Sequence, residues 1–332
     1  MLFHKALIFS DTHFGRAGNS SQANQDNLDF LVWAIDEART WGADQCFMLG
    51  DWFDQRSSVG VQTLHQALRG LELLSENFRH SWFILGNHDL YFRDRRDITS
   101  IEFARHIPNL TLINDPLEID DVTFLPWLVG DEHQQLVVKT RYVFGHLEIA
   151  GFLRNSRSVM PEGPHTVVSQ QLAGPDLILS GHFHKRQVSR GNICYVGNIM
   201  PFDFTDDGET ERGMMLLEWG HDPIFRTWPD QPLYQSIKLS ELSESVLKPR
   251  MTLRLTVDLD LKYEEAQDLR DGFVRDFGLR KIELNHVRDE IEDDDVDIEF
   301  QTIDQIVLQA LDNIESVGLS KQRLIEIYQE LI

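Results

Sequence analysis

Short apolar runs alternate with segments of helical spacing through the first part of the chain. The expected strands are residues 5–9, 43–49 and 81–85, and the helices expected between them are residues 26–41 and 59–78. Strands that alternate with helices indicate βαβ units and a largely parallel sheet. Ligands of such sheets bind at the carboxyl ends of the strands, so we expect the functional residues there.

Shorter strands are expected further along the chain. They are residues 110–113, 122–125, 141–144, 176–179, 187–189, 193–196, 213–219 and 224–228. The close, hairpin-like spacing after residue 187 predicts a second sheet, mainly antiparallel, that packs on the first. The predicted fold class is therefore α/β, as a two-sheet α/β sandwich.

The pattern changes near residue 240, where serines and acids precede Pro249. The expected elements after this point are a strand at 251–261, a helix at 264–277, a strand at 280–284, an acidic stretch at 290–297 and helices at 302–314 and 320–332. We therefore expect a main domain (1–240), a small α+β domain (241–300) and a helical segment (301–332).

The composition is that of an ordinary globular protein. Hydrophobic residues make up 42% of the 332 residues and charged residues 26%, and no apolar run approaches the roughly 20 residues of a membrane helix. We expect no membrane association. The start of the chain lacks a signal-peptide cleavage site, and Cys46 and Cys194 lie in apolar runs as expected for buried free thiols. A reducing, cytoplasmic compartment is the expectation.

The net charge of −23 argues against a nucleic-acid partner. About half of it lies in residues 241–332, and some of the remaining acids are candidate metal ligands, whose charge bound cations would offset. The charge therefore weakens a nucleic-acid hypothesis without excluding it.

Metal-ligating residues follow five of the expected strands. The central case is the run 46–49, which breaks at Gly50 into a turn that carries Asp51 and Asp54. Alone, such a turn is more often an ordinary surface feature, but four other segments repeat the arrangement. The seven candidate ligands are Asp11, His13, Asp51, Asn87, His146, His182 and His184.

Imidazoles combined with carboxylate or amide oxygens suit a borderline ion such as Mn²⁺, Fe²⁺ or Zn²⁺. A closed structural zinc site is not expected, because no set of thiolates accompanies them. Seven ligands exceed what one ion needs, so the sequence predicts two divalent metal ions that share a carboxylate.

These five motifs resemble those of the calcineurin-like metallophosphoesterases, over roughly residues 5–230. The resemblance implies the metallophosphoesterase fold, with Asp51 bridging the two ions. It assigns Asp11, His13 and His184 to one ion and Asn87, His146 and His182 to the other. It also implies that His88 is a general acid beside the scissile phosphate and that Asp54 orients and charges it; a turn cap is the alternative role for Asp54.

Within this superfamily the chain is most similar to the SbcD-type DNA repair nucleases, including the recombination endonuclease subunits of T-even bacteriophages. The motifs that carry this similarity are Gly-Asp-Trp-Phe-Asp at 50–54, Gly-Asn-His-Asp-Leu at 86–90, Gly-His-Leu-Glu-Ile-Ala-Gly-Phe at 145–152 and Ser-Gly-His-Phe-His at 180–184. The similarity implies a Mn²⁺-dependent DNA nuclease of recombination or repair, with exonuclease activity on duplex ends and endonuclease activity on single strands.

The same similarity implies partners for the chain. It implies a homodimer and an SbcC-type coiled-coil ATPase subunit bound by the helices of 301–332, with residues 241–300 capping the DNA. Packing of these helices on the chain's own catalytic domain is the alternative.

Basic residues lie close to three of the five motifs and are candidate contacts to DNA phosphates. They are Arg93, Arg95, Arg96, Arg154, Arg157, Lys185, Arg186 and Arg190. Ordinary solvated surface charge is the alternative for many of them. No base-reading motif is present, so we expect no strong sequence preference.

Two other functions remain open. A small-molecule phosphodiesterase of the same fold would use the same motifs but would have no use for the C-terminal segment. A metal-free interaction scaffold is disfavoured, because all seven candidate ligands and His88 are present.

Overall fold

The computed structural model describes residues 1–155, 158–163, 166–189, 191–286 and 323. The two helices expected in 302–314 and 320–332 and the acidic stretch 290–297 therefore lie outside the described residues, except for residue 323.

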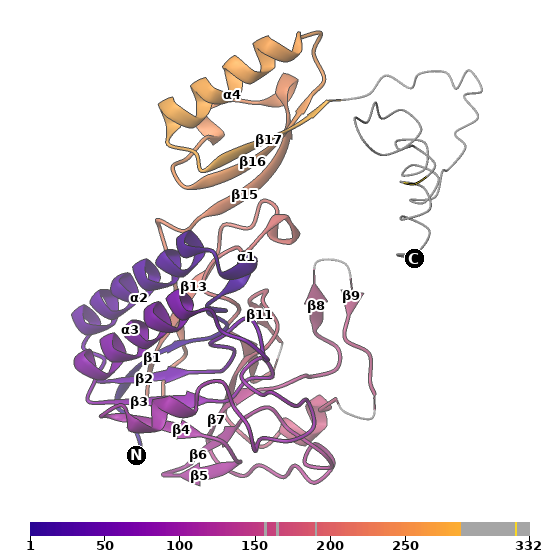
Figure 1. The fold of residues 1–332 in the computed structure, drawn as a ribbon. Coiled ribbons are helices and arrows are strands. Elements are labelled where there is room, and N and C mark those ends of the chain that lie inside the picture. The colour runs from indigo at the N-terminus through magenta and orange to yellow at the C-terminus, as the bar shows by residue number, and fades with distance from the viewer. Residues whose placement is uncertain (156–157, 164–165, 190, 287–322, 324–332) are drawn as a thin grey trace. The chain divides into compact units, whose positions relative to one another are not determined.

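The first sheet has six strands in the order β14-β13-β1-β2-β3-β4 (Figure 1). Its strands are β1 (Lys5–Phe9), β2 (Gln45–Met48), β3 (His80–Ile84), β4 (Leu110–Ile113), β13 (Gly213–Glu218) and β14 (Ile224–Thr227). Strands β1 to β4 are parallel, and β13 and β14 add an antiparallel edge. The short α1 (Arg16–Asn19) precedes α2 (Ser21–Trp41), and α2 and α3 (Val61–Asn77) cover one face of this sheet.

The second sheet also has six strands, in the order β11-β12-β10-β7-β6-β5. Its bounds are β5 (Leu117–Ile119), β6 (Val122–Leu125), β7 (Tyr142–His146), β10 (Leu177–Gly181), β11 (Gln187–Val188) and β12 (Ile193–Tyr195). The four central strands are parallel, and β5 and β11 are antiparallel edges. A separate hairpin consists of β8 (Leu153–Asn155) and β9 (Ser158–Val159).

The two sheets pack face to face through a core of large aromatic and aliphatic side chains. Phe3, Phe47, Phe124 and Phe144 belong to this core, and the rings of Phe47 and Phe144 have centroids 4.5 Å apart. Burial of such rings is the main favourable contribution to the packing of two sheets. The predicted two-sheet α/β sandwich is thereby confirmed.

The prediction of a mainly antiparallel second sheet built from the strands after residue 187 is wrong. Strands β13 and β14 extend the first sheet, and β12 lies parallel to β10 in the second. The spacing of short strands limits the length of the connections but does not determine which sheet a strand joins. Strand β13 is buried over nearly its whole length because it lies next to the central strand β1.

A third, small sheet contains β15 (Leu233–Lys238), β16 (Met251–Val257) and β17 (Lys281–His286), all parallel, with α4 (Tyr263–Phe277) between β16 and β17. It has a core of its own that includes Met251, Leu253 and Leu255. This sheet begins ahead of the boundary expected at residue 240. Short 3₁₀ helices complete the described elements, at Glu102–His106, Ser169–Leu172, Phe204–Asp206, Leu239–Glu241 and Glu244–Val246.

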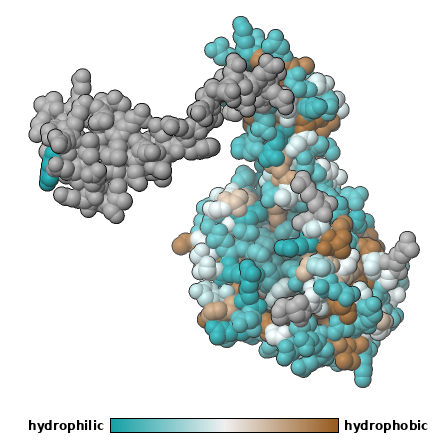
Figure 2. Space-filling model, turned by 90° about the vertical axis from the view of Figure 1, so that its right-hand side faces the viewer, coloured by the Kyte–Doolittle hydropathy of each residue, from teal (hydrophilic) through white to brown (hydrophobic). Residues whose placement is uncertain are grey.

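The surface shown in Figure 2 is mainly hydrophilic, and its hydrophobic residues lie in small separate patches. Among the described residues, no helix has the length and apolar character needed to cross a membrane.

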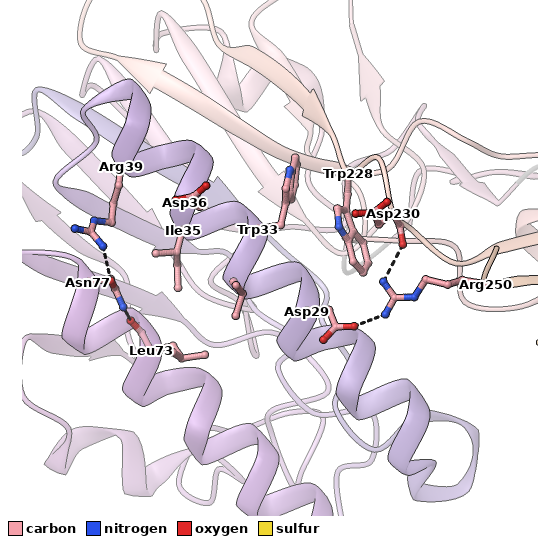
Figure 3. A pocket seen from close by; sticks show the side chains of 11 residues that line it. Asp29, Trp33, Ile35, Asp36, Arg39, Leu73, Asn77, Trp228, Asp230 and Arg250 are labelled. Carbon is pink, nitrogen blue, oxygen red and sulfur yellow. Dashed lines mark hydrogen bonds and ion pairs between the residues drawn. The ribbon is translucent and has the colours of Figure 1, made fainter. Parts of the chain in front are cut away.

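Asp26 on α2 ties the small sheet to the first sheet's helical layer. Its carboxylate is fully buried and accepts hydrogen bonds from two guanidinium groups. Nη1 of Arg280 lies 2.6 Å from Oδ2, and Nη2 of Arg250 lies 3.1 Å from Oδ1. Arg16, itself buried, lies 3.9 Å away. Arg250 also binds Asp29 and the carbonyl of Asp230 (Figure 3). One buried carboxylate therefore balances several arginines.

We predict that Asp26→Ala lowers the free energy of unfolding by about 3–5 kcal/mol, because it leaves the buried Arg16 and the partly buried Arg250 and Arg280 without the buried carboxylate that they share. Urea unfolding of the metal-free protein measures this. The matched control is Asp29→Ala, whose carboxylate is 37% exposed and should cost about 1 kcal/mol or less. Equal effects of the two substitutions would contradict the prediction.

Candidate metal centre

The carboxyl ends of β1, β2, β3, β7 and β10 bring all seven candidate ligands together. Two groups form, each with ligand atoms that lie within 4.8 Å of one another: Asp11, His13 and His184 in the first, and Asp51, His146 and His182 in the second. Asn87 belongs beside the second group, because its Oδ1 lies 3.0 Å from Nε2 of His146 and 2.9 Å from Nδ1 of His182. Each group could hold one cation.

Asp51 lies between the two groups. Its Oδ2 is 3.7 Å from Nε2 of His13, in the first group, and 3.4 Å from Nε2 of His146, in the second. Its other oxygen accepts the backbone N–H of His88 at 2.7 Å. Asp51 is therefore placed where a carboxylate shared by two cations would lie.

Glycines allow the ligand loops to approach this closely. A Cβ atom on Gly50 would overlap the ring of His146 and lie 2.7 Å from the backbone of Gly86, and one on Gly181 would lie 2.5 Å from the carbonyl of Leu49. Gly50 also has a φ of +96°, a backbone conformation that residues other than glycine rarely adopt. The glycines of these motifs are thus required by the crossing of the loops.

Several candidate ligands have unusual backbone conformations. Asp11, His13, Asp51 and His182 have φ values of 55°, 49°, 59° and 97°. In residues other than glycine, positive φ values are energetically unfavourable and are found mainly at functional sites, where the surrounding structure stabilises them. Here backbone hydrogen bonds do so: the N–H groups of Asp11 and His13 donate to the carbonyls of Gly50 and Asp51, at 3.0 and 3.1 Å.

Asp89 joins the loops after β2 and β3, a role that sequence reasoning missed. Its buried carboxylate accepts the backbone N–H groups of Gly86, Asp51 and Trp52, each at 2.9 Å. The signal was available, because Asp89 is the fourth residue of the Gly-Asn-His-Asp motif.

Polar groups on the far side of the rings orient two of the histidines, by a hydrogen bond for His146 and by an ion-pair contact for His13. Nδ1 of His146 donates to the carbonyl of Leu49 at 2.6 Å, and Nδ1 of His13 lies 3.3 Å from the carboxylate of Asp54. In both rings Nε2 therefore faces the ligand group, with its lone pair available to a cation.

The expected contact between the carboxylate of Asp54 and His88 needs correction. The family resemblance implied that its carboxylate orients and charges His88, but it is the backbone carbonyl of Asp54 that accepts a hydrogen bond from Nδ1 of His88, at 2.6 Å. The carboxylate turns to His13 instead. Burial lowers the pKa of His88 below its ordinary value, against the attraction of Asp51.

The charges of the centre favour bound cations. Burial by itself disfavours a charged imidazole, but Asp11, Asp54 and Asp51 raise the pKa of His13 to about 10. In the same way Asp51 and Asp11 raise the pKa of His146 to about 9. Burial, and then repulsion from His13, lower the pKa of His184 to about 4, so this ring is neutral.

The residues present fit two divalent cations. Nε2 of His13 is buried and has no hydrogen-bond partner in the described part of the chain, which is costly unless a ligand pairs with it. The donors are nitrogens and oxygens of the kinds that Mn²⁺, Fe²⁺ and Zn²⁺ accept.

We predict that cation binding at pH 7 releases about two protons per chain. His13 and His146 are protonated in the metal-free protein at this pH and must lose those protons to become ligands. The apparent affinity should therefore rise with pH until about 9 at the group that contains His146 and until about 10 at the group that contains His13. Titration calorimetry in buffers of different ionisation enthalpy counts the protons, and binding without proton release would contradict the prediction. Substitution of the exposed His221 by alanine should leave the count unchanged.

We predict that Asp89→Ala costs about 3 kcal/mol or more in the free energy of unfolding, since three buried N–H groups lose their acceptor. It should also weaken cation binding, because the Asp51 loop loses its anchor. Asp89→Asn keeps one acceptor oxygen and should be milder on both counts. Urea unfolding and Mn²⁺ titration measure the two effects, and an Asp89→Ala protein as stable as wild type would contradict the assignment.

The candidate DNA contacts divide into several kinds. Arg96 is an incorrect prediction: it is only 7% exposed and binds Glu132 and the carbonyl of Trp127, so it is structural. Lys185 and Arg186 pair with Glu209 and Glu211, each at 2.7 Å. The placement of the others is as follows: Arg93 is exposed, Arg95 pairs with Asp97 at 3.2 Å, Arg154 lines a cavity, and Arg157 and Arg190 lie outside the described residues.

That cavity, of about 330 Å³, opens beside the ligand groups. His88, Arg154, His182, His184, Lys185, Asp206, Glu209 and Arg212 are among the residues that line it. Arg212 also holds the loop of the first group, because it donates to the carbonyl of His184 at 2.8 Å and pairs with Asp206. A larger cavity of about 600 Å³ shares none of these residues; Trp33, Arg39, Trp228 and Arg250 lie along it (Figure 3).

Comparison with known proteins gives a family match for more than half of the chain. Residues 4–186 match the family model described as calcineurin-like phosphoesterase. No curated protein sequence matches.

Solved structures with similarity to the chain include a dimetal phosphatase from Danio rerio, at 11% identity and a TM-score of 0.39, covering 68% of this chain and 96% of that one. The E. coli phosphoesterase Yfce matches at 14% identity and a TM-score of 0.35, and the match covers 68% of this chain and 94% of Yfce. The Pseudomonas putida nuclease MPE matches at 18% identity and a TM-score of 0.28, and the match covers 57% of this chain and 66% of the nuclease.

Proposed function

The chain belongs to the calcineurin-like phosphoesterase family and is a metal-dependent hydrolase, and from this premise we propose that it is a Mn²⁺-dependent DNA nuclease. In this proposal Asp11, His13 and His184 would hold one ion, Asn87, His146 and His182 would hold the other, and Asp51 would be shared by both. It cuts duplex ends as an exonuclease and single strands as an endonuclease.

The observation that most supports a phosphodiesterase is the position of His88 on the wall of the same cavity as His182 and His184. The ring of His88 also lies 4.9 Å from the ring of His13, between centroids. A phosphate at the two ligand groups would therefore have an imidazole beside it.

Two cations in these groups supply Lewis acidity, which neutralises phosphate charge and activates water. The chain itself supplies the proton for the leaving oxygen. Because Nδ1 of His88 donates to the Asp54 carbonyl, Nε2 is the nitrogen left to face the substrate and to deliver a proton once the ring is protonated. Asp54 holds this ring and the His13 ring in one arrangement.

DNA as the substrate is supported by the motifs shared with the SbcD-type nucleases and by the cations around the cavity. Arg154, Lys185 and Arg212 line it, and Arg93 and Arg186 lie in the adjoining loops. Phosphates would compete with Glu209 and Glu211 for Lys185 and Arg186, so we expect binding by the isolated chain to be weak and salt-dependent.

The proposed partners rest on the resemblance of the motifs to those of the SbcD-type nucleases, which include nuclease subunits of T-even bacteriophages. We propose that the chain acts as a homodimer in the cytoplasm, in recombination or repair, with an SbcC-type ATPase held by residues 301–332. The small sheet with α4 would cap the DNA.

One observation favours a small-molecule phosphodiesterase as the second candidate. Asp206 and Glu209 lie on the wall of the cavity, and these acids repel a polyanion more than a small ester. Its volume of about 330 Å³ is in the range of small-molecule sites.

The deciding experiment is Mn²⁺-dependent degradation of end-labelled linear duplex and single-stranded DNA. We predict cutting by wild type and a loss of about 10²-fold or more in His88→Ala, which lacks the proton donor. The matched control, His221→Ala, changes an exposed histidine outside the centre and should cut like wild type.

Intact DNA together with turnover of bis-p-nitrophenyl phosphate would contradict the nuclease proposal and support the small-molecule alternative. The comparison is repeated with the ATPase subunit added, because the isolated chain is expected to bind DNA weakly.

A further inference from the structure

We propose that Glu148 is a positioning residue of the second ligand group, which keeps the His182 ring turned with its Nδ1 lone pair toward the cation. The proposal rests on the two-cation centre described above. No role for Glu148 follows from the motifs themselves, since the residues that they assign to the cations do not include it.

The two nitrogens of His182 face different partners. Nδ1 lies 2.9 Å from Oδ1 of Asn87, among the ligand atoms, and Nε2 lies 3.6 Å from Oε1 of Glu148. In a neutral imidazole only one nitrogen carries the proton. The Oδ1 atom of Asn87 only accepts hydrogen bonds, so Nδ1 donates to it in the metal-free protein. A metal ligand at this position needs the lone pair on Nδ1 instead, and a carboxylate in electrostatic contact with Nε2 favours the proton there.

The ring of His182 is less confined by its surroundings than the rings of His13 and His146, so it depends more on a polar partner for its orientation. Its side chain is 17% exposed, whereas those of His13 and His146 are 4% and 0% exposed. The rings of Trp127 and Phe183 lie near it, with centroids 5.0 and 4.9 Å away. Apolar rings limit tilting but do not distinguish the two nitrogens, whereas a carboxylate does.

Glu148 completes a pattern among the candidate ligands. The nitrogen facing away from the cations meets the carboxylate of Asp54 in His13, the carbonyl of Leu49 in His146 and the carboxylate of Glu148 in His182. Partners of this kind fix the tautomer and raise the basicity of histidine ligands.

The backbone explains why this side chain can reach His182. Glu148 comes two residues after His146, the last residue of β7, and the next residue, Ile149, forms an isolated β-bridge with Val167. The carbonyl of Glu148 accepts the N–H of Val167 at 2.9 Å, which anchors its backbone.

A direct contact with substrate is not the role that the surroundings suggest. Among the described residues, Glu148 does not line the cavity of about 330 Å³ beside His88. It borders a cavity of about 10 Å³ with Trp127 and His146, which has room for roughly one water molecule.

The test is titration calorimetry of Mn²⁺ into the metal-free full-length protein, for wild type, Glu148→Ala and Glu148→Gln. Wild type should bind two ions. In Glu148→Ala one site should weaken by about 10–100-fold, the usual effect of losing such a partner, while the other keeps its affinity. Glu148→Gln retains an acceptor without the charge and should weaken the same site by a smaller, measurable factor.

Activity gives the second readout. The Glu148→Ala protein should regain phosphodiesterase activity at high Mn²⁺ concentration, because its defect is one of occupancy. The matched control is Glu72→Ala, an exposed carboxylate on α3, which should leave both sites unchanged.

Two-site binding with wild-type affinity in both Glu148 variants would overturn the proposal while leaving the two-cation centre intact. If wild type itself bound fewer than two ions, the two-cation centre would fail and this proposal with it. Should Glu148→Ala not fold, Glu148→Gln decides alone: a weakened site supports the proposal and an unchanged one overturns it.

Discussion

The carboxylate of Asp51 lies close to both ligand groups because the loops after β2, β3 and β10 pack so tightly that a Cβ atom does not fit at their crossing points. Gly50, Gly86 and Gly181 have no room for a Cβ atom, and Asp89 binds the backbone of two loops at once. Close packing of backbones therefore comes first, and the ligand geometry follows from it. The aromatic core between the sheets holds the strands whose ends carry these loops.

The same crowding determines the electrostatics. Acids and imidazoles are buried together, so without cations His13 and His146 hold protons that their carboxylate neighbours attract. Bound cations would take the place of these protons, among donor atoms that already surround the two positions. The outer partners Asp54, Leu49 and Glu148 then determine which nitrogen each ring presents, so the centre depends on residues behind the ligands as well as on the ligands.

The location of the centre could be predicted from sequence because the carboxyl ends of parallel strands converge, and each motif follows a strand. Individual contacts could not. Whether Asp54 meets His88 with its carboxylate or its carbonyl depends on a side-chain rotamer, and the burial of Arg96 depends on Trp127 and Glu132, which lie far along the chain. The placement of β13 in the first sheet likewise depends on pairing with β1, a distant segment.

The position of Asp51 between the two ligand groups implies that two cations would share its carboxylate. Anomalous diffraction from crystals grown with Mn²⁺ tests it most directly, because it locates the ions independently of activity. We expect two peaks about 3.5–4 Å apart, one beside His13 and His184, the other beside His146 and His182, with the Asp51 carboxylate between them. A single peak, or two peaks of which only one contacts Asp51, would contradict it.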